Sequence, residues 1–103
     1  MRQILCSERA FARRQAIEDY ILYSFGYAAH AEYVEAVNEW KSIVRENPYA
    51  GPVEPVLEGG CKEYRSVVIA NLTKCIYYVE DDCIMIADWW DTRRSVSQLK
   101  QNL

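Results

Sequence analysis

Apolar runs broken by two short polar pairs occupy residues 61–94, and this pattern predicts three consecutive β-strands. We expect the strands at Tyr64–Ala70, Lys74–Val79 and Cys83–Trp90, which are rich in Val, Ile, Tyr and Trp. Asn71-Leu72 and Asp81-Asp82 are the predicted turns, because Asn and Asp tolerate left-handed backbone. Connections this short require neighbouring strands to run antiparallel. The second half of the chain is therefore predicted to be a three-stranded meander.

Two-residue turns also predict which side chains share a face of the sheet. They place Lys74 opposite Ile69 and Trp89, and Tyr78 opposite Arg65 and Met85. One face then carries a cationic and aromatic set, which is the predicted working surface: Arg65, Lys74, Tyr78, Trp89 and Asp91. The other face is almost wholly apolar and should lie under helices: Val68, Ala70, Tyr77, Val79, Ile84 and Ile86. A change of one residue in either connection would exchange the faces.

The first half of the chain shows helical periodicity. After a short strand at Arg2–Cys6, Ser7 is the predicted N-cap of a helix over Glu8–Ser24, which Gly26 should end. A second helix is predicted over Ala28–Arg45, and so short a connection implies an antiparallel hairpin. A proline- and glycine-rich loop, Asn47–Gly60, leads to the meander, and Ser95–Leu103 is a polar tail. The order predicts one two-layer α+β domain over residues 1–103.

Composition narrows the class of protein. The 103 residues carry a formal net charge of −3, which disfavours bulk, non-specific binding to nucleic acid. Cys6, Cys61, Cys75 and Cys83 lack metal-ligand spacing, so we expect buried, reduced thiols in a cytosolic protein and no metal site. No signal peptide and no stretch long enough to span a membrane is expected.

Several segments, in this order, resemble the RelE/ParE superfamily of toxins from bacterial type II toxin–antitoxin modules. The resemblance covers nearly the whole chain. It implies a cytoplasmic growth inhibitor, linked to plasmid stabilization, that a cognate antitoxin neutralises. It implies no cofactor for the protein. The segments are Ser7-Glu8-Arg9-Ala10, Ile17-Glu18-Asp19-Tyr20-Ile21, Glu46-Asn47-Pro48-Tyr49-Ala50-Gly51, Tyr64-Arg65, Ile76-Tyr77-Tyr78-Val79 and Asp91-Thr92-Arg93-Arg94.

The resemblance implies two alternative targets. RelE-like members cut messenger RNA in the ribosome, which would make the chain a metal-independent endoribonuclease. Such cleavage needs cations, a base and an acid. Basic residues match the positions of the cations: Arg65, Lys74, Arg93 and Arg94. Tyr78 or Asp91 would then supply the base or the acid.

ParE-like members instead inhibit DNA gyrase by binding it, and the departures from the RelE pattern favour this branch. The single histidine, His30, is far from the meander, no tyrosine follows Arg94, and the loop Asn47–Pro55 is more similar to the ParE side. In this reading the binding residues are Arg65, Trp89, Asp91, Arg93 and Arg94. A degenerate member that only binds partners is the third hypothesis, so whether the chain is an enzyme stays open.

Structural roles compete with these functional ones. Arg65 is expected to pair with Asp88 or Glu63 if it is structural, and Lys74 to be a solvated lysine after a turn. Trp89 and Trp90 must point to opposite faces, with one in the core and the other exposed or covered by a partner. Arg93-Arg94 can hold either phosphate or an acidic antitoxin segment.

Overall fold

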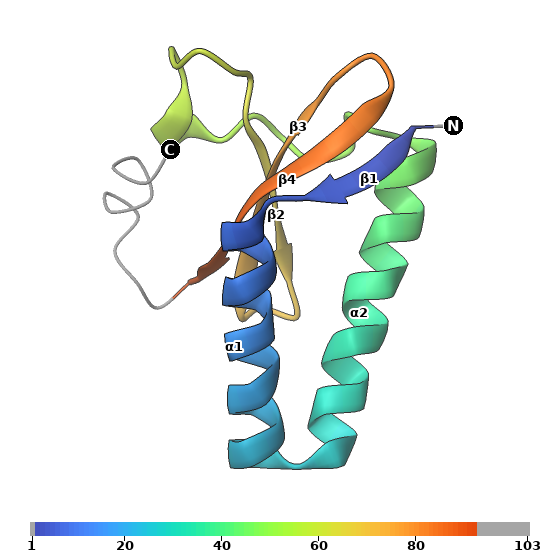
Figure 1. Cartoon of the computed structure of the whole chain (residues 1–103), viewed down its shortest axis with the longest axis vertical. Helices are drawn as coiled ribbons and strands as arrows, with labels where there is room; N and C mark the ends of the chain where they lie inside the picture. The colour runs from blue at the N-terminus through green and yellow to red at the C-terminus, as the bar shows by residue number, and fades with distance from the viewer. Residues whose placement is uncertain (1, 93–103) are drawn as a thin grey trace.

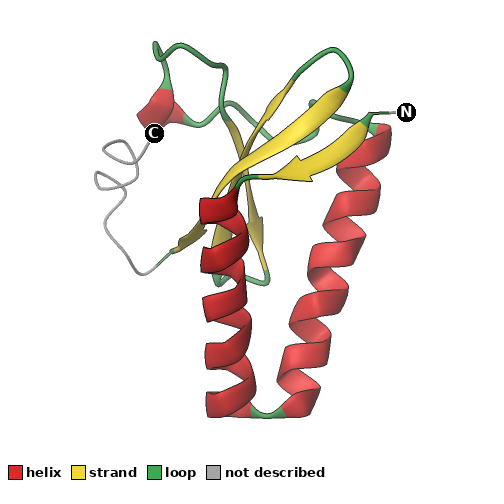
Figure 2. Ribbon diagram, in the orientation of Figure 1, coloured by secondary structure: helices red, strands yellow, loops and turns green. Residues whose placement is uncertain are grey.

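The computed structural model describes residues 2–92, so Arg93, Arg94 and the predicted tail Ser95–Leu103 lie outside the described residues. The predicted order of one strand, two helices and three strands is confirmed (Figure 2). Each of these elements begins and ends within one residue of the expectation. The elements are β1 (Gln3–Cys6), α1 (Glu8–Phe25), α2 (Tyr27–Glu46), a 3-10 turn η1 (Pro55–Leu57), β2 (Arg65–Ile69), β3 (Thr73–Val79) and β4 (Cys83–Asp91).

The four strands form one mixed sheet in the order β1-β4-β3-β2. Strand β1 runs parallel to β4, whereas β2, β3 and β4 form the predicted antiparallel meander. The helical hairpin packs on one face of the sheet and extends beyond it, so the loop joining the helices lies far from the strands (Figure 1). The molecule is thus a two-layer α+β structure, as the pattern predicted.

Local chemistry sets both ends of α1. The Ser7 hydroxyl accepts a hydrogen bond from the Ala10 backbone N–H at 3.1 Å, which is the predicted N-cap. The same hydroxyl donates to the Ala87 carbonyl at 2.9 Å and so ties the start of α1 to β4. Gly26 ends the helix with φ of 93°, a left-handed conformation in which a side chain is disfavoured.

The main core fills the space between the hairpin and the sheet. The Trp40 ring makes edge contacts with Tyr77 and Trp89, at centroid distances of 5.6 and 6.4 Å. The indole N–H of Trp89 donates to the Tyr33 hydroxyl at 2.8 Å, and that hydroxyl lies 2.8 Å from Thr73 Oγ1. These hydrogen bonds satisfy the polar groups that the core aromatic residues carry inward.

The predicted register is wrong at two points. Ile69 pairs with Thr73, so the first connection holds three residues rather than two, with Ala70 and Asn71 at φ of 56° and 54°. The second turn is as predicted, and Tyr78 lies opposite Met85. Farther along β4 the register shifts by one residue. Ile86 lies opposite Tyr77 and Asp88 lies opposite Ile76, so Ala87 is the extra residue of a β-bulge.

These two irregularities redistribute the predicted faces. Lys74 and Tyr78 face away from the helices as predicted. Arg65, Trp89 and Asp91 instead have registers that place them on the face of the sheet toward the helices. The predicted face that joined Arg65 to Lys74 is therefore not formed. Four of the predicted core positions keep their side of the sheet, Tyr77, Val79, Ile84 and Ile86, whereas Val68 is half exposed and Ala70 lies in the turn.

The face away from the helices is partly covered by the loop after α2. Leu57, from η1, packs with Ile76, Trp90 and Tyr64 in a second small core. The loop also pairs with β2, since the Ser66 N–H donates to the Pro52 carbonyl at 3.0 Å. Both Trp89 and Trp90 are consequently buried on opposite faces, which contradicts the expectation that one of them is exposed or awaits a partner.

The cysteines only partly follow the prediction. Cys75 is buried, and its burial raises the pKa of the thiol well above its ordinary value. Cys6 and Cys61 are exposed and Cys83 is half exposed, so the expectation of four buried thiols is wrong. All four are free thiols in the described structure.

Candidate functional site

Arg65 joins β2 to the loop before it. Its guanidinium donates to the Gly51 carbonyl at 2.8 Å and to a Glu63 carboxylate oxygen at 2.8 Å. The guanidinium carbon also lies 5.0 Å from the centre of the Tyr49 ring. Glu63 is one of the two structural partners that the sequence suggested, and the other, Asp88, pairs elsewhere. The charge of Arg65 is therefore engaged within the chain.

Lys74 forms an ion pair that sequence reasoning did not find. Its ammonium lies 2.6 Å from the carboxylate of Glu54, a side chain only 1% exposed. Burial by itself would raise the pKa of Glu54, but hydrogen bonds from Lys74 and the Val56 N–H more than offset it, so the pKa is lowered. Lys74 is thus not the solvated lysine expected after a turn. Glu54 sits in a loop 20 residues away, where no local pattern marks it.

Tyr78 belongs to an aromatic and charged group at the same face. The rings of Tyr64 and Tyr78 meet edge to face at 5.8 Å, and the Lys62 ammonium lies 4.8 Å from the centre of the Tyr78 ring. Lys62 in turn pairs with Glu80 at 3.0 Å. Burial raises the pKa of Tyr64. This end of the sheet therefore offers aromatic surface beside a cation that a carboxylate already neutralises.

A second buried carboxylate lies on β4. Both oxygens of Asp88 accept hydrogen bonds from Arg13 Nη1 of α1, each at 2.8 Å, and one also accepts from the Trp89 N–H. Strand β1 pairs only with residues 83–86 of β4, which leaves the edge beside Asp88 open to the helix. The Arg13 guanidinium also lies 5.2 Å from the centre of the Trp90 ring. This pair holds α1 against the sheet.

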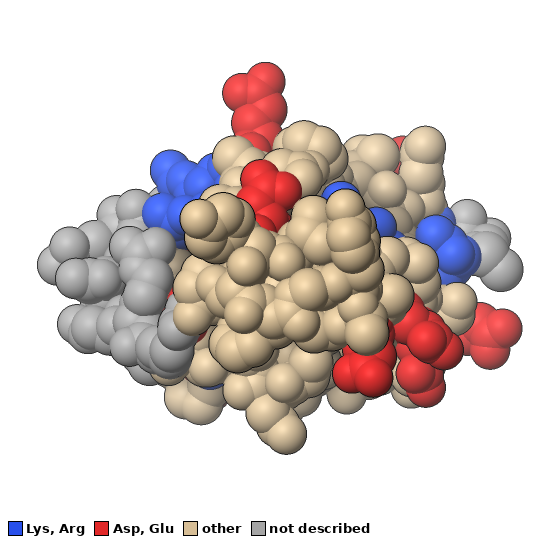
Figure 3. Space-filling model, turned by 90° about the horizontal axis from the view of Figure 1, so that it is seen from below, with Lys and Arg blue, Asp and Glu red and all other residues tan. Residues whose placement is uncertain are grey.

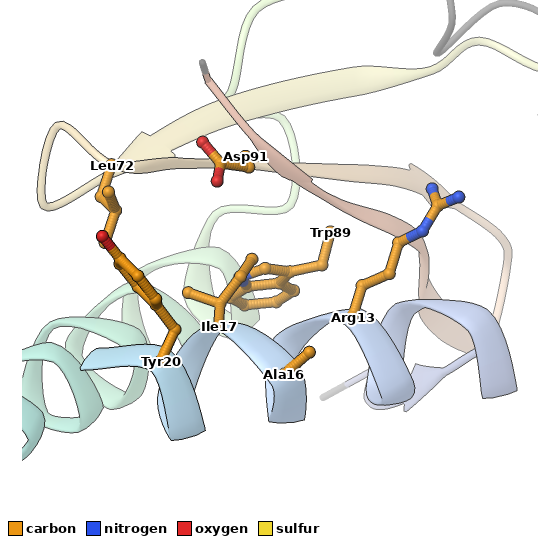
Figure 4. A pocket seen from close by; sticks show the side chains of 7 residues that line it. All are labelled: Arg13, Ala16, Ile17, Tyr20, Leu72, Trp89 and Asp91. Carbon is orange, nitrogen blue, oxygen red and sulfur yellow. The ribbon is translucent and has the colours of Figure 1, made fainter. Parts of the chain in front are cut away.

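Two predicted binding residues, Trp89 and Asp91, meet in a pocket between α1 and the end of β4. The pocket has a volume of about 300 Å³ and is lined by Arg13, Ala16, Ile17, Tyr20, Leu72, Trp89 and Asp91. Figure 4 shows the Trp89 and Ile17 side chains at its floor and the Asp91 carboxylate directed into it from the strand. Tyr20 rises from α1 toward Leu72, at the opposite end from the Arg13 guanidinium. We call this site the α1 pocket.

The structure therefore separates the predicted site residues into different regions. Trp89 and Asp91 line the α1 pocket, Lys74 and Tyr78 lie on the other face, and Arg65 is held by the loop before β2. Arg93 and Arg94 lie outside the described residues. The roles assigned to these residues stay predictions. Sequence reasoning missed Glu54 and Arg13 and named Asp88 only as a possible partner of Arg65, because the partner of each is supplied by tertiary contacts alone.

Neither a metal centre nor a membrane span is found in the described part of the chain. Among residues 2–92 there is no group of three His, Cys, Asp or Glu side chains placed to hold a metal ion. No helix among these residues is both long enough and apolar enough to cross a bilayer.

This architecture is the β-α-α-β-β-β fold of RelE/ParE toxin structures. The chain is similar to "Chromosomal ParDE TA system from P. aeruginosa", with a TM-score of 0.69 and 16% identity over 88% of this chain and 96% of that one. It is also similar to "The structure of YoeB dimer from Staphylococcus aureus", with a TM-score of 0.60 and 22% identity over 86% and 94%. A third match is "YoeB/ParE toxin from Agrobacterium tumefaciens", with a TM-score of 0.59 and 16% identity over 86% and 96%.

Sequence comparison adds nothing to these structural matches, since no protein-family model and no curated protein matches the chain. Both ParE-type and YoeB-type structures share the fold, which therefore does not select between the two branches.

Proposed function

We propose that this protein is the toxin component of a type II toxin–antitoxin module of the RelE/ParE superfamily, acting in the cytoplasm. The observation that carries the proposal is the fold match to a ParDE system over 88% of this chain and 96% of that one. The order and spacing of the segments that resemble the superfamily, from Ser7 to Asp91, support the same proposal. The similarity to a ParDE TA system also supports a cognate antitoxin as the partner.

Within the superfamily we favour a ParE-like protein that inhibits DNA gyrase by binding. A nuclease of the RelE type stabilises developing phosphorane charge with cations. Of the predicted cations, the two that the structure describes each face a carboxylate: Arg65 lies 2.8 Å from Glu63 and Lys74 lies 2.6 Å from Glu54. Cations neutralised in this way are better suited to holding a surface in shape than to binding phosphate.

A RelE-like, metal-independent endoribonuclease is the second candidate, and in it the Glu54–Lys74 pair would have a catalytic instead of a structural role. The pair sets an ionised, buried carboxylate beside an ammonium, which are a base and a cation of the kind that RNA cleavage uses. The observation that favours this candidate is the similarity to YoeB structures. In this alternative the ribosome and its messenger RNA are the target, and Glu54 joins the predicted catalytic residues.

Induced expression in a bacterial host tests both candidates. Growth, pulse-labelled DNA synthesis and pulse-labelled protein synthesis are followed together after induction. A ParE-like inhibitor should block DNA synthesis first, whereas an early fall in protein synthesis would support the RelE-like alternative. Soluble, folded protein that leaves growth unchanged in several bacterial hosts would refute the toxin proposal and leave a partner-binding module.

Paired variants separate catalysis from folding in the same assay. Glu54→Gln keeps the shape of the side chain and its contact with Lys74 but removes the base. An endoribonuclease would lose toxicity with this variant while remaining folded by circular dichroism. A gyrase inhibitor should keep it. Lys62→Met, which breaks an exposed ion pair with Glu80, is the matched control and should leave either activity intact.

A further inference from the structure

Strand β2 lies at one edge of the sheet, and only the first half of that edge is covered. The order β1-β4-β3-β2 leaves the side of β2 away from β3 open. The loop before β2 covers part of it, because the Ser66 N–H donates to the Pro52 carbonyl at 3.0 Å. The Glu54 N–H donates to the Tyr64 carbonyl at 2.8 Å in the same way. Among the described residues this cover ends at Ser66, so the edge at residues 67–69 is open.

Val68 holds the backbone groups that the open edge offers to a partner. Successive residues of a strand direct their N–H and C=O groups to opposite sides, so those of Val68 point the same way as those of Ser66, away from β3. No backbone partner for them is found among residues 2–92. Residues 67–69 are Val-Val-Ile, without the charge, proline or bulge that usually prevents pairing at an edge. This edge can therefore pair with one further strand.

A groove between α2 and β2 would receive side chains of such a strand. Its volume is about 220 Å³, and its lining is mainly apolar, from residues that include Trp40, Ile43 and Val67. Glu39 adds a carboxylate, and Ile43 and Val68 are each 51% exposed. Val67 packs toward the helices, so a strand paired with β2 would direct every second side chain to the same face and into the groove. We call this site the β2 groove.

Helix α2 gives the β2 groove a negative rim. Glu32, Glu35 and Glu39 recur at three and four residues, so they share one side of the helix, and all three are exposed. None of the ion pairs formed by residues 2–92 involves them. Lys41, the first cation of α2, lies instead where its charge interacts with that of Arg14 on α1. Figure 3 shows acidic side chains gathered at the border of the molecule on the side of α2. A complementary segment is therefore basic as well as apolar.

The same charges disfavour a second copy of the chain as the occupant. Two β2 edges paired antiparallel are related by a two-fold axis perpendicular to the sheet, which places both helical layers on the same face. The acidic rows of the two α2 helices would then border one joint, where like charges repel. Nucleic acid is disfavoured for the same reason.

We propose that the β2 groove binds an extended segment of a partner protein, which joins the four described strands as a fifth. The segment runs antiparallel to β2, as the loop at Val53 already does, and its backbone pairs with the N–H and C=O of Val68. Toward the helices it carries apolar side chains, which enter the groove, and a lysine or arginine, which pairs with Glu39. The occupant is defined by this chemistry, and the proposal does not depend on the chain being a toxin.

A five-residue peptide, N-acetyl-Val-Thr-Lys-Thr-Val-amide, tests the proposal on the full-length protein. In an extended strand its valine and lysine side chains lie on one face and its threonines on the other. Binding is followed by the backbone amide signals in two-dimensional NMR at low salt. The Val68 amide should shift and exchange its hydrogen more slowly when the peptide is bound. Replacing the lysine by glutamine should weaken binding about fivefold, as for a partly exposed ion pair.

Two N-methylated forms of the peptide test the strand geometry. In an antiparallel pair the residue opposite Val68 has its side chain on the same face as Val68, so that residue is a threonine, and its N–H points toward β2. Methylating both threonine nitrogens should abolish binding. Methylating both valine nitrogens, whose N–H groups point away from β2, is the matched control and should leave binding intact.

Two variants of the protein make the result specific to this edge. Val68→Pro removes the N–H that points away from β3 and leaves the ladder between β2 and β3 in place, so it should abolish binding. Glu39→Lys, at an exposed position of α2, should make a peptide with glutamate in place of lysine the tighter ligand. Tyr23→Ser, at the exposed end of the helical hairpin, is the control and should change neither result. Unchanged amide signals elsewhere establish that each variant is folded.

Three outcomes would overturn the proposal. Equal binding of the two methylated peptides, or shifts that leave Val68 unaffected, would show that no strand is added at this edge. Equal affinity of the lysine, glutamine and glutamate peptides would remove the role of Glu39. Shifts of the Val68 amide on raising the protein concentration without peptide would assign the edge to a second copy of the chain. Growth arrest is measured separately, so its absence would refute the proposed function and leave this result unchanged.

Discussion

Replacing Lys74 by methionine would leave the Glu54 carboxylate buried without its partner. The two groups lie 2.6 Å apart, and the Glu54 side chain is only 1% exposed, so water cannot readily take the place of the ammonium. Methionine keeps most of the length and volume of the lysine stem. The change therefore removes the charge while disturbing the packing of β3 as little as possible.

The size of the effect follows from this burial. Removing one member of a buried ion pair typically costs 3–5 kcal/mol, because an uncompensated charge remains in the protein. Lys74 is itself 24% exposed, so solvent already screens part of the pair, and we expect a loss of about 3 kcal/mol at pH 7. In a domain of this length each kcal/mol corresponds to roughly 4–8 °C, which gives a fall in Tm of roughly 12–24 °C.

The pH dependence provides an independent check with a definite sign. In the wild-type protein the pKa of Glu54 is lowered from its ordinary value of 4.5, so its contribution to stability is present above pH 4.5 and is lost as the pH falls through the folded-state pKa. In the Lys74→Met variant, burial without the ammonium raises this pKa, and the carboxyl can protonate at mildly acidic pH. The difference in stability between the two proteins should therefore shrink from pH 7 toward pH 4.

Urea unfolding followed by tryptophan fluorescence measures both quantities. The slope of free energy against urea should be the same for the two proteins, so that the shift in midpoint reports stability. Glu54→Gln with Lys74→Met, compared with each single variant, isolates the interaction between the two side chains. A loss below about 1 kcal/mol, or a loss that stays constant from pH 7 to pH 4, would refute the account of a buried pair.

Three further substitutions test how the fold is held together. Arg13→Ala should cost about 3 kcal/mol in urea unfolding, because Asp88 is fully buried and would lose both hydrogen bonds to the guanidinium; a loss under about 1 kcal/mol would show that the pair is not needed. Gly51→Ala should cost about 2 kcal/mol, since its Cβ would stand 2.7 Å from the Tyr77 hydroxyl oxygen. A thermal midpoint unchanged from wild type would contradict that close approach. Ser7→Ala should lower stability by about 1 kcal/mol through loss of the N-cap of α1, and equal stability of this variant and an exposed Ser24→Ala control would refute the capping role.

The sequence by itself determined the elements of this protein. Periodicity placed both helices and all four strands within one residue of their observed boundaries. The capping residues Ser7 and Gly26 were readable because they act through backbone groups a few residues away. The order of elements then predicted the two-layer architecture and the meander. All of these features depend on local chemistry and on the burial of one apolar face.

Only the tertiary structure decided which side chains meet. One extra residue in the turn after Ile69 and the bulge at Ala87 shift the register, and each single-residue shift moves side chains to the other face of the sheet. As a result, Arg65 and Lys74 do not lie on the same face of the sheet as predicted, whereas Trp89 and Asp91 line one pocket. The buried pairs made by Glu54 and Asp88 join segments 20 and 75 residues apart. Such long-range pairs leave no periodic signal in the chain, because their strength comes from the burial that folding itself creates.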